Sequence, residues 1–186
     1  MKWVKWIAIV LAALIVLPAI TLMIMGHRAN AGTSHVALEI NAAPDQLWTW
    51  LDDGDKLKQW ISWMVDVKYP NPEKARAVGG KRVWTMRDEN NGGAMMQLAG
   101  TFTEYTPPSL MTFQMADSEG LFNGETSYRL TDLGGGRTRM EVTMHAHYNQ
   151  WFANLMEPVI TPAAEKKLGM DVQSLKRLAE AQAAVH

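Results

Sequence analysis

The hydrophobic pattern of the chain begins with one long apolar run. Residues 6–25 contain no charged side chain, and a helix of about twenty residues rises about 30 Å, the thickness of the hydrocarbon core of a bilayer. Pro18 lies inside the run, and membrane-spanning helices tolerate proline where neighbouring groups satisfy the backbone. The run therefore predicts a single-pass transmembrane helix.

The charges on either side of this run predict its orientation. Lys2, Lys5 and the terminal amine precede it, whereas Arg28 follows it, so the positive-inside rule places the N-terminus in the cytoplasm and the rest of the chain outside. A cleaved signal peptide is the alternative, because residues 29–31, Ala-Asn-Ala, have the form of a cleavage site. The run is longer than the roughly 7–15 apolar residues of a signal core, which favours the uncleaved anchor.

Beyond residue 31 the hydrophobic period changes, and we expect an anchor and tether over residues 1–31 and one α+β domain over residues 32–186. Residues 35–40 alternate, with Val36 and Leu38 on one face, which predicts a half-buried strand. The next elements expected are two short helices, at residues 43–51 and 56–60, and six antiparallel strands joined by short turns, at 63–69, 81–88, 94–105, 110–115, 124–131 and 137–148.

The end of the chain predicts one long amphipathic helix. Thr161 and Pro162 have the form of a cap and a first-turn proline. Leu168, Val172 and Leu175 then form an apolar stripe at spacings of three and four residues. A sheet that is buried on one face needs such a helix to cover it.

Composition limits the chemistry that the domain can perform. The chain has no cysteine, which excludes disulfides, thiolate nucleophiles and cysteine-ligated metal centres. Once residues 1–31 are set aside, 15 basic residues stand against 19 acidic ones, a net charge of −4. No cluster of lysine and arginine interleaves with aromatic residues, so the sequence argues against a nucleic-acid partner.

Five short segments carry a resemblance to a known family. They are residues 40–48 (INAAPDQLW), 57–60 (LKQW), 103–110 (TEYTPPSL), 134–140 (GGGRTRM) and 175–180 (LKRLAE). In this order and spacing, over about residues 34–183, the chain resembles the START-like superfamily, also called SRPBCC, whose bacterial members include proteins labelled polyketide cyclase or lipid-transport-like. The resemblance implies a helix-grip fold, in which a curved antiparallel sheet wraps around a long C-terminal helix and encloses an apolar cavity for lipids, sterols, polyketides or other hydrophobic molecules.

On this resemblance, inward strand positions and the C-terminal helix line a ligand cavity. Methionine is flexible and polarisable, so a methionine-rich lining suits a permissive pocket. The alternative is that the same side chains simply fill a core. The expected lining residues are Val36, Leu38, Met96, Leu98, Phe102, Met111, Phe113, Met115, Tyr128, Met140, Val142, Met144, Leu168 and Val172.

The leading hypothesis is a membrane-anchored, extracytoplasmic domain that binds a hydrophobic small molecule or lipid, without a cofactor and without an assigned catalytic residue. A polyketide-cyclase-like enzyme using the same cavity is the second hypothesis. It needs an acid–base group, for which Tyr128 and Glu104 are the polar candidates near the inward register, with Glu104 expected in solvent at a strand end. A protein-interaction module with a filled core is the third hypothesis.

Two further features have alternative interpretations. His145 and His147 share a strand face with Glu141, but we assign that face to solvent, and two histidines without further ligands predict no resident metal. The tryptophans expected mostly in the core are Trp48, Trp60, Trp63, Trp84 and Trp151. The alternative for Trp151, with Phe152, Leu155 and Met156, is an apolar lip at the cavity mouth that faces the membrane.

Overall fold

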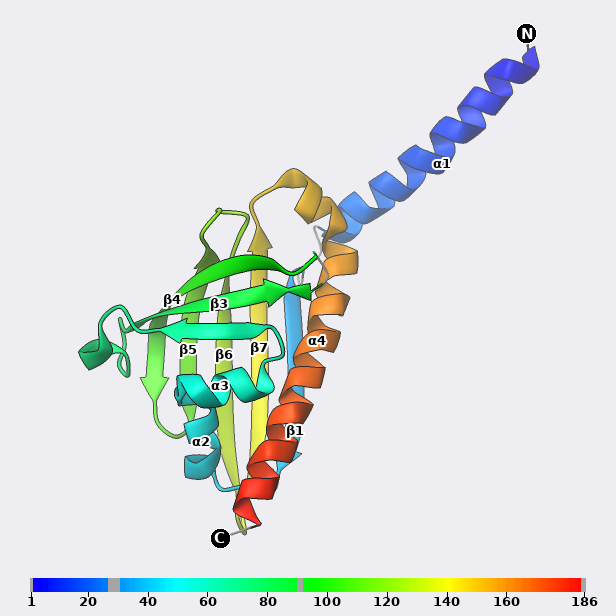
Figure 1. Ribbon diagram of the computed structural model, residues 1–186. Helices are drawn as coiled ribbons and strands as arrows, with labels where there is room; N and C mark the ends of the chain where they lie inside the picture. The colour runs from blue at the N-terminus through cyan, green and yellow to red at the C-terminus, as the bar shows by residue number, and fades with distance from the viewer. Residues whose placement is uncertain (1, 27–30, 90–91, 185–186) are drawn as a thin grey trace.

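The computed structural model describes residues 2–26, 31–89 and 92–184 (Figure 1). Its elements in chain order are α1 (Lys2–Gly26), β1 (Thr33–Ile40), α2 (Pro44–Asp52), α3 (Gly54–Trp60), β2 (Met64–Lys68), η1 (Pro72–Lys74), β3 (Lys81–Asp88), β4 (Ala94–Thr106), β5 (Leu110–Asp117), β6 (Phe122–Gly134), β7 (Arg137–Tyr148) and α4 (Trp151–Ala183).

The strands form one seven-stranded antiparallel sheet in the order β1-β7-β6-β5-β4-β3-β2. Figure 1 shows that β2, β3 and β4 cross over β5, β6 and β7, so that the sheet curls around its inner face, with α4 lying along the open side. The register of β4 shifts between Phe102 and Glu104, and such bulges bend a strand and increase its twist. The α+β helix-grip architecture expected from the sequence is confirmed.

Alternate strand residues build the core on the inner face. Phe113 on β5 is the centre of an aromatic group, with ring centroids 4.9 Å from Trp84, 5.6 Å from Phe102 and 6.0 Å from Tyr128. From α4, Val172, Leu175 and Ala179 are buried against this side. Large aromatic side chains bury much apolar area each, and this group forms the centre of the core.

The long helix begins earlier than the sequence predicts. We expected its start at Thr161 and Pro162, but α4 begins at Trp151 and contains Pro158 and Pro162. Each proline removes one backbone N–H, and both lie on the same side of the helix because they are four residues apart. The helix therefore bends instead of ending, and Figure 1 shows its first turns set at an angle to the rest.

A buried ionic cluster ties α2 to the sheet. Arg82 on β3, which is only 1% exposed, pairs with Asp52 at the end of α2. The same carboxylate accepts a 2.9 Å hydrogen bond from the Tyr105 hydroxyl and pairs with Arg76 Nε at 2.6 Å. Burial and the neighbouring Asp52 carboxylate raise the pKa of Tyr105 to about 12, so this tyrosine remains a hydrogen-bond donor at physiological pH.

Two glycines provide a matched test of this packing. A Cβ added to Gly100 would lie 2.3 Å from the Trp84 ring, whereas one added to Gly169 on α4 meets nothing within 4 Å. We expect Gly100→Ala to destabilise the fold by about 1–3 kcal/mol through overpacking. We expect Gly169→Ala to stabilise it by about 0.5–1 kcal/mol, because a helical glycine is entropically costly. Thermal unfolding of the two variants checks both signs, and a stabilised Gly100→Ala protein contradicts the packing described.

Candidate functional site

The candidate site is the inner face of the sheet together with the side of α4 that packs against it. Eight of the predicted lining residues are buried in the core: Leu98, Phe102, Met111, Phe113, Tyr128, Met140, Val142 and Val172. Six are half-buried: Val36, Leu38, Met96, Met115, Met144 and Leu168. The structure thus brings these side chains to one face, while their contact with a ligand stays a prediction.

Burial along the inner face is uneven. Met86 and Met96 on the β3–β4 hairpin, and Met115 and Met144 on β5 and β7, are all half-buried. Met144 pairs with Ser34 at the start of β1, and Met115 lies in the next row of the sheet, so both lie toward the end of the domain that α1 joins. Met96 lies beyond Leu98, which pairs with Asp117 at the end of β5. At the opposite end Met140 and Leu130 are buried, whereas Leu38, which pairs with Met140, is half-buried. We call the four half-buried methionines, Met86, Met96, Met115 and Met144, the methionine mouth.

Two polar residues of β6 lie on this inner face. Thr126 pairs across the sheet with Phe113 and Met144, is 3% exposed, and its hydroxyl Oγ1 has no hydrogen-bond partner among the described residues. Tyr128 follows two residues later on the same face, and its ring stacks on Phe113. Burial, and to a lesser extent the nearby Asp171 carboxylate, raises the pKa of the Tyr128 phenol, which therefore stays protonated at neutral pH.

Asp171 on α4 carries a negative charge that acts on Tyr128. Its Oδ1 accepts hydrogen bonds from the Ser62 backbone N–H at 3.2 Å and the Ser62 hydroxyl at 2.9 Å, and its Oδ2 pairs with Lys167 Nζ at 2.5 Å. The Lys167 ammonium also lies 4.6 Å from the centre of the Trp63 ring. This carboxylate is therefore already paired and hydrogen-bonded, and it ties α4 to the segment between α3 and β2.

A second buried carboxylate fixes the start of the domain. Glu157 on α4 is 3% exposed, and its Oε1 accepts hydrogen bonds of 2.7 Å from the Gly32 backbone N–H and from the Thr161 hydroxyl. Gly32 has a φ of +72°, and a Cβ there would lie 2.0 Å from the Ala146 carbonyl oxygen, so only glycine fits. Because Gly32 closely follows α1, this contact holds the methionine mouth near the end of that helix.

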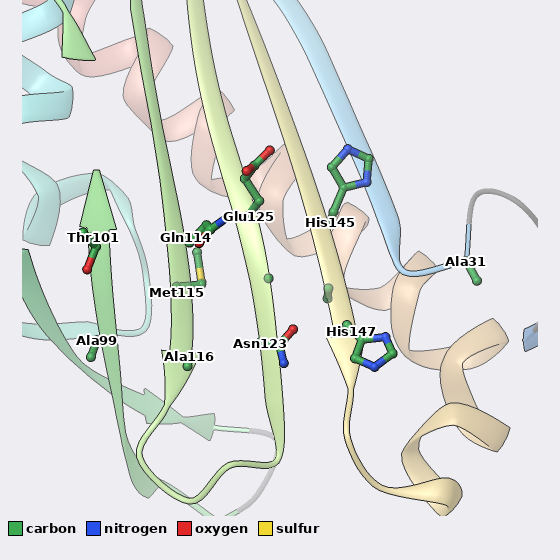
Figure 2. A pocket seen from close by; sticks show the side chains of 12 residues that line it. Ala31, Ala99, Thr101, Gln114, Met115, Ala116, Asn123, Glu125, His145 and His147 are labelled. Carbon is green, nitrogen blue, oxygen red and sulfur yellow. The ribbon is translucent and has the colours of Figure 1, made fainter. Parts of the chain in front are cut away.

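An open groove of about 680 Å³ lies across β4 to β7, and its lining includes Met115, Gly124 and Ala146 beside the outward-facing residues of the same strands. Figure 2 shows Gln114, Glu125, His145 and His147 along its strands. Both histidines are exposed, as predicted, and His145 Nδ1 lies 3.0 Å from the Thr33 hydroxyl. Within the described ranges no three histidine, aspartate or glutamate side chains are grouped to hold a metal ion.

The other predicted polar and aromatic residues divide between core and surface. Glu104 is exposed beside the β4 bulge and accepts a 2.8 Å hydrogen bond from Thr112, so it does not reach the inner space. Trp48, Trp60 and Trp84 are buried as expected, and Trp63 is half-buried. By contrast, Trp151 is 78% exposed and Phe152 is 57% exposed on the first turn of α4, so the expectation of a buried Trp151 is wrong and these two rings face outward.

Sequence reasoning missed Thr126, Asp171 and Glu157. The alternation that places Tyr128 inward also places Thr126 inward, so the pattern could have predicted Thr126 as an inward residue. Asp171 directly precedes Val172 of the apolar stripe, and the pattern alone would place it beside the stripe. Thr161, four residues from Glu157, is a local partner. No local signal identifies its other partner, Gly32, which lies 125 residues away.

The two buried threonines of the inner face allow a paired stability test. Thr126 Oγ1 has no partner, whereas Thr138 Oγ1 donates a 2.7 Å hydrogen bond to the Ala42 carbonyl oxygen. We expect Thr126→Val to stabilise the unliganded protein by about 1 kcal/mol, because it removes a buried unsatisfied group at constant shape. We expect Thr138→Val to destabilise it by about 1–3 kcal/mol. Unfolding curves of both variants, in the same detergent, check this difference, and a destabilised Thr126→Val protein contradicts the unpartnered hydroxyl.

Comparison with known structures supports the fold. A protein from Chromobacterium violaceum aligns with a TM-score of 0.64 at 15% identity, over 80% of this chain and 97% of that one. A conserved protein from Geobacillus kaustophilus aligns with a TM-score of 0.66 at 13% sequence identity, over 79% of this chain and 94% of that one. A protein from Thermus thermophilus aligns with a TM-score of 0.62 at 15% sequence identity, over 81% of this chain and 98% of that one. At these identities the likeness concerns the fold alone.

Comparison at the sequence level identifies a family but no closer relative. None of the curated proteins compared with the chain matches it. A family model described as polyketide cyclase / dehydrase and lipid transport matches residues 32–180. That match spans β1 through most of α4 and so covers the whole sheet together with the helix that it grips. The chain therefore belongs to the polyketide cyclase / dehydrase and lipid transport family, within the SRPBCC type of helix-grip proteins.

Proposed function

We propose that this protein is a membrane-anchored domain that binds a hydrophobic small molecule or lipid between its sheet and α4. The observation that carries the proposal is the methionine mouth, where four methionines of the inner face are only half-buried. Single apolar side chains are often partly exposed, but apolar side chains grouped on one surface mark ligand-binding or interaction sites. The family description, which includes lipid transport, supports the same function.

The chemistry of the inner space favours binding over turnover. A polyketide-cyclase-like enzyme needs an acid–base group whose pKa lies near the working pH. The pKa of Tyr128 is raised further from neutrality, and Asp171 is engaged by Ser62 and Lys167. The Tyr128 phenol is therefore a poor acid or base at neutral pH, and the Asp171 oxygens are taken up by hydrogen bonds within the protein. We place the enzyme second and a filled interaction module third.

The membrane part of the proposal rests on α1. Trp3–Met25 is apolar over 23 residues and long enough to span a bilayer, and a signal sequence remains the alternative for a helix in this position. Trp3 and Trp6 lie where interfacial aromatic residues belong, and the flanking charges favour a cytoplasmic N-terminus with the domain outside. Because Glu157 binds Gly32, the exposed Trp151 and Phe152 begin α4 beside the end of α1 (Figure 1).

Filling the methionine mouth tests ligand binding. We expect the full chain, purified in detergent, to carry an apolar molecule that organic extraction and mass spectrometry identify. Met115→Trp, on the half-buried inner face, is expected to lower that yield at least fivefold because the larger ring occupies the space. Met170→Trp, at an exposed position of α4, is the matched control and is expected to leave the yield unchanged. Wild-type protein that carries no apolar molecule and takes up none contradicts the proposal and favours the interaction module.

Single cysteines test the orientation of the domain, since the chain has none of its own. A polarity-sensitive fluorophore on Phe152→Cys is expected to emit at shorter wavelength in nanodiscs and to be quenched by spin-labelled lipid, because that site faces the bilayer. The same probe on Leu133→Cys, an exposed apolar site at the far hairpin, is the control and is expected to remain unquenched. Equal quenching at the two sites contradicts the proposed orientation, and intact mass of the purified chain distinguishes the anchor from a cleaved leader.

A further inference from the structure

We infer that Thr126 and Tyr128 form a polar anchor for a ligand with one uncharged hydrogen-bonding group, such as a hydroxyl or carbonyl, at the end of an apolar body. This inference rests on the proposed function and adds to it the chemical class of the ligand. It starts from a feature that the apolar lining does not explain, a buried hydroxyl without a partner.

The unpartnered hydroxyl belongs to Thr126. The register of β6 sets this residue between Phe113 on β5 and Met144 on β7, both on the inner face. Its hydroxyl therefore has apolar neighbours on both sides within the sheet and no hydrogen bond from the described residues. Folded proteins rarely leave such a group unpaired, because burying it costs free energy that a valine would not cost. A hydrogen bond from a ligand would recover that free energy.

Tyr128 supplies the second polar atom of the anchor. It lies two residues from Thr126 along β6, so both side chains point to the same face. Its ring is held against Phe113, with centroids 6.0 Å apart, and is 9% exposed. No described residue is hydrogen-bonded to the Tyr128 hydroxyl. The phenol can therefore donate a hydrogen bond to a ligand oxygen while the threonine hydroxyl donates or accepts another.

The surrounding charges select an uncharged group. Asp171 is near enough to Tyr128 to disfavour a further negative charge there, while Lys167 and Ser62 already occupy the Asp171 oxygens. A carboxylate or phosphate would lose its hydration without gaining a free cation, and an ammonium would find no free carboxylate, so both would be buried at high cost. A hydroxyl or carbonyl has a much smaller desolvation cost, which Thr126 and Tyr128 can offset.

The next row of the sheet shows where the apolar body lies. Beside Thr126, toward α1, Met115 pairs with Gly124, which pairs in turn with Ala146. A Cβ at Gly124 would lie 2.3 Å from the His145 carbonyl oxygen, and Ala146 has only a methyl group. Of these three residues only Met115 has a long side chain, and it is flexible. We therefore place the polar group deep in the domain and the apolar body along Met115 and the methionine mouth, toward the end of α1.

A matched pair of probes tests the anchor. The full chain in nanodiscs is equilibrated with 1-hexadecanol or with n-heptadecane, which replaces the hydroxyl by a methyl group, and the retained probe is extracted and measured against empty nanodiscs. We expect the wild type to bind the alcohol about fivefold more tightly, as one neutral hydrogen bond allows. Thr126→Val and Tyr128→Phe are each expected to reduce this ratio to about two or less while heptadecane binding persists. Thr131→Val, at an exposed position of the same strand, is expected to retain the wild-type ratio.

The outcomes separate the anchor from the proposed function. If the wild type retains both probes equally, or if Thr126→Val keeps the fivefold preference, the anchor is overturned although an apolar site exists. Tighter binding of hexadecanoate than of hexadecanol overturns the uncharged class. If neither probe is retained above empty nanodiscs, the proposed function fails and the anchor fails with it.

Discussion

The whole domain depends on one constraint: three helices have to cover the inner face of a seven-stranded sheet. α4 packs along this face, and α2 and α3 add buried side chains such as Leu47, Trp48 and Trp60 to the same core. The strands β2, β3 and β4 curl over and bring their own apolar side chains to the same interior (Figure 1). Bulges such as that between Phe102 and Glu104 make this curl possible. The aromatic side chains at the centre of this interior are buried, whereas the methionines of the methionine mouth stay half-buried.

Acidic side chains on α4 set how the helix lies on the sheet. Glu157, Asp171 and Glu180 accept backbone N–H groups from Gly32, Ser62 and Asn41. These contacts fasten the helix at its bend, near its middle and near its end, at points remote in sequence. Charge-assisted hydrogen bonds of this kind are directional, whereas apolar contact is not. The helix can therefore hold its position even where its apolar contacts with the sheet are incomplete, which a binding space requires.

One buried group on β6 lowers the stability of the fold. A valine at position 126 would suit its neighbours Phe113 and Met144 better than a threonine with an unpaired hydroxyl. Proteins keep such locally unfavourable groups chiefly at functional sites, where a ligand rather than the fold satisfies them. Among the buried ionic groups, the carboxylates of Asp52 and Asp171 are both paired within the protein. Arg82 Nε, like Thr126 Oγ1, has no hydrogen-bond partner among the described residues, but its guanidinium is paired with Asp52 through another nitrogen.

Local sequence patterns predict the order of the main elements and which strand residues share a face. The strands at residues 81–88 and 137–148 have the predicted bounds, because side-chain alternation is a local property of a strand. The three-dimensional packing sets the remaining features: α4 continues through Pro158 and Pro162, Trp151 is exposed, and Glu157 accepts a hydrogen bond from Gly32. These features arise from contacts between segments more than a hundred residues apart or from the bend of a helix over a curved sheet, and no local pattern of polar and apolar residues encodes either.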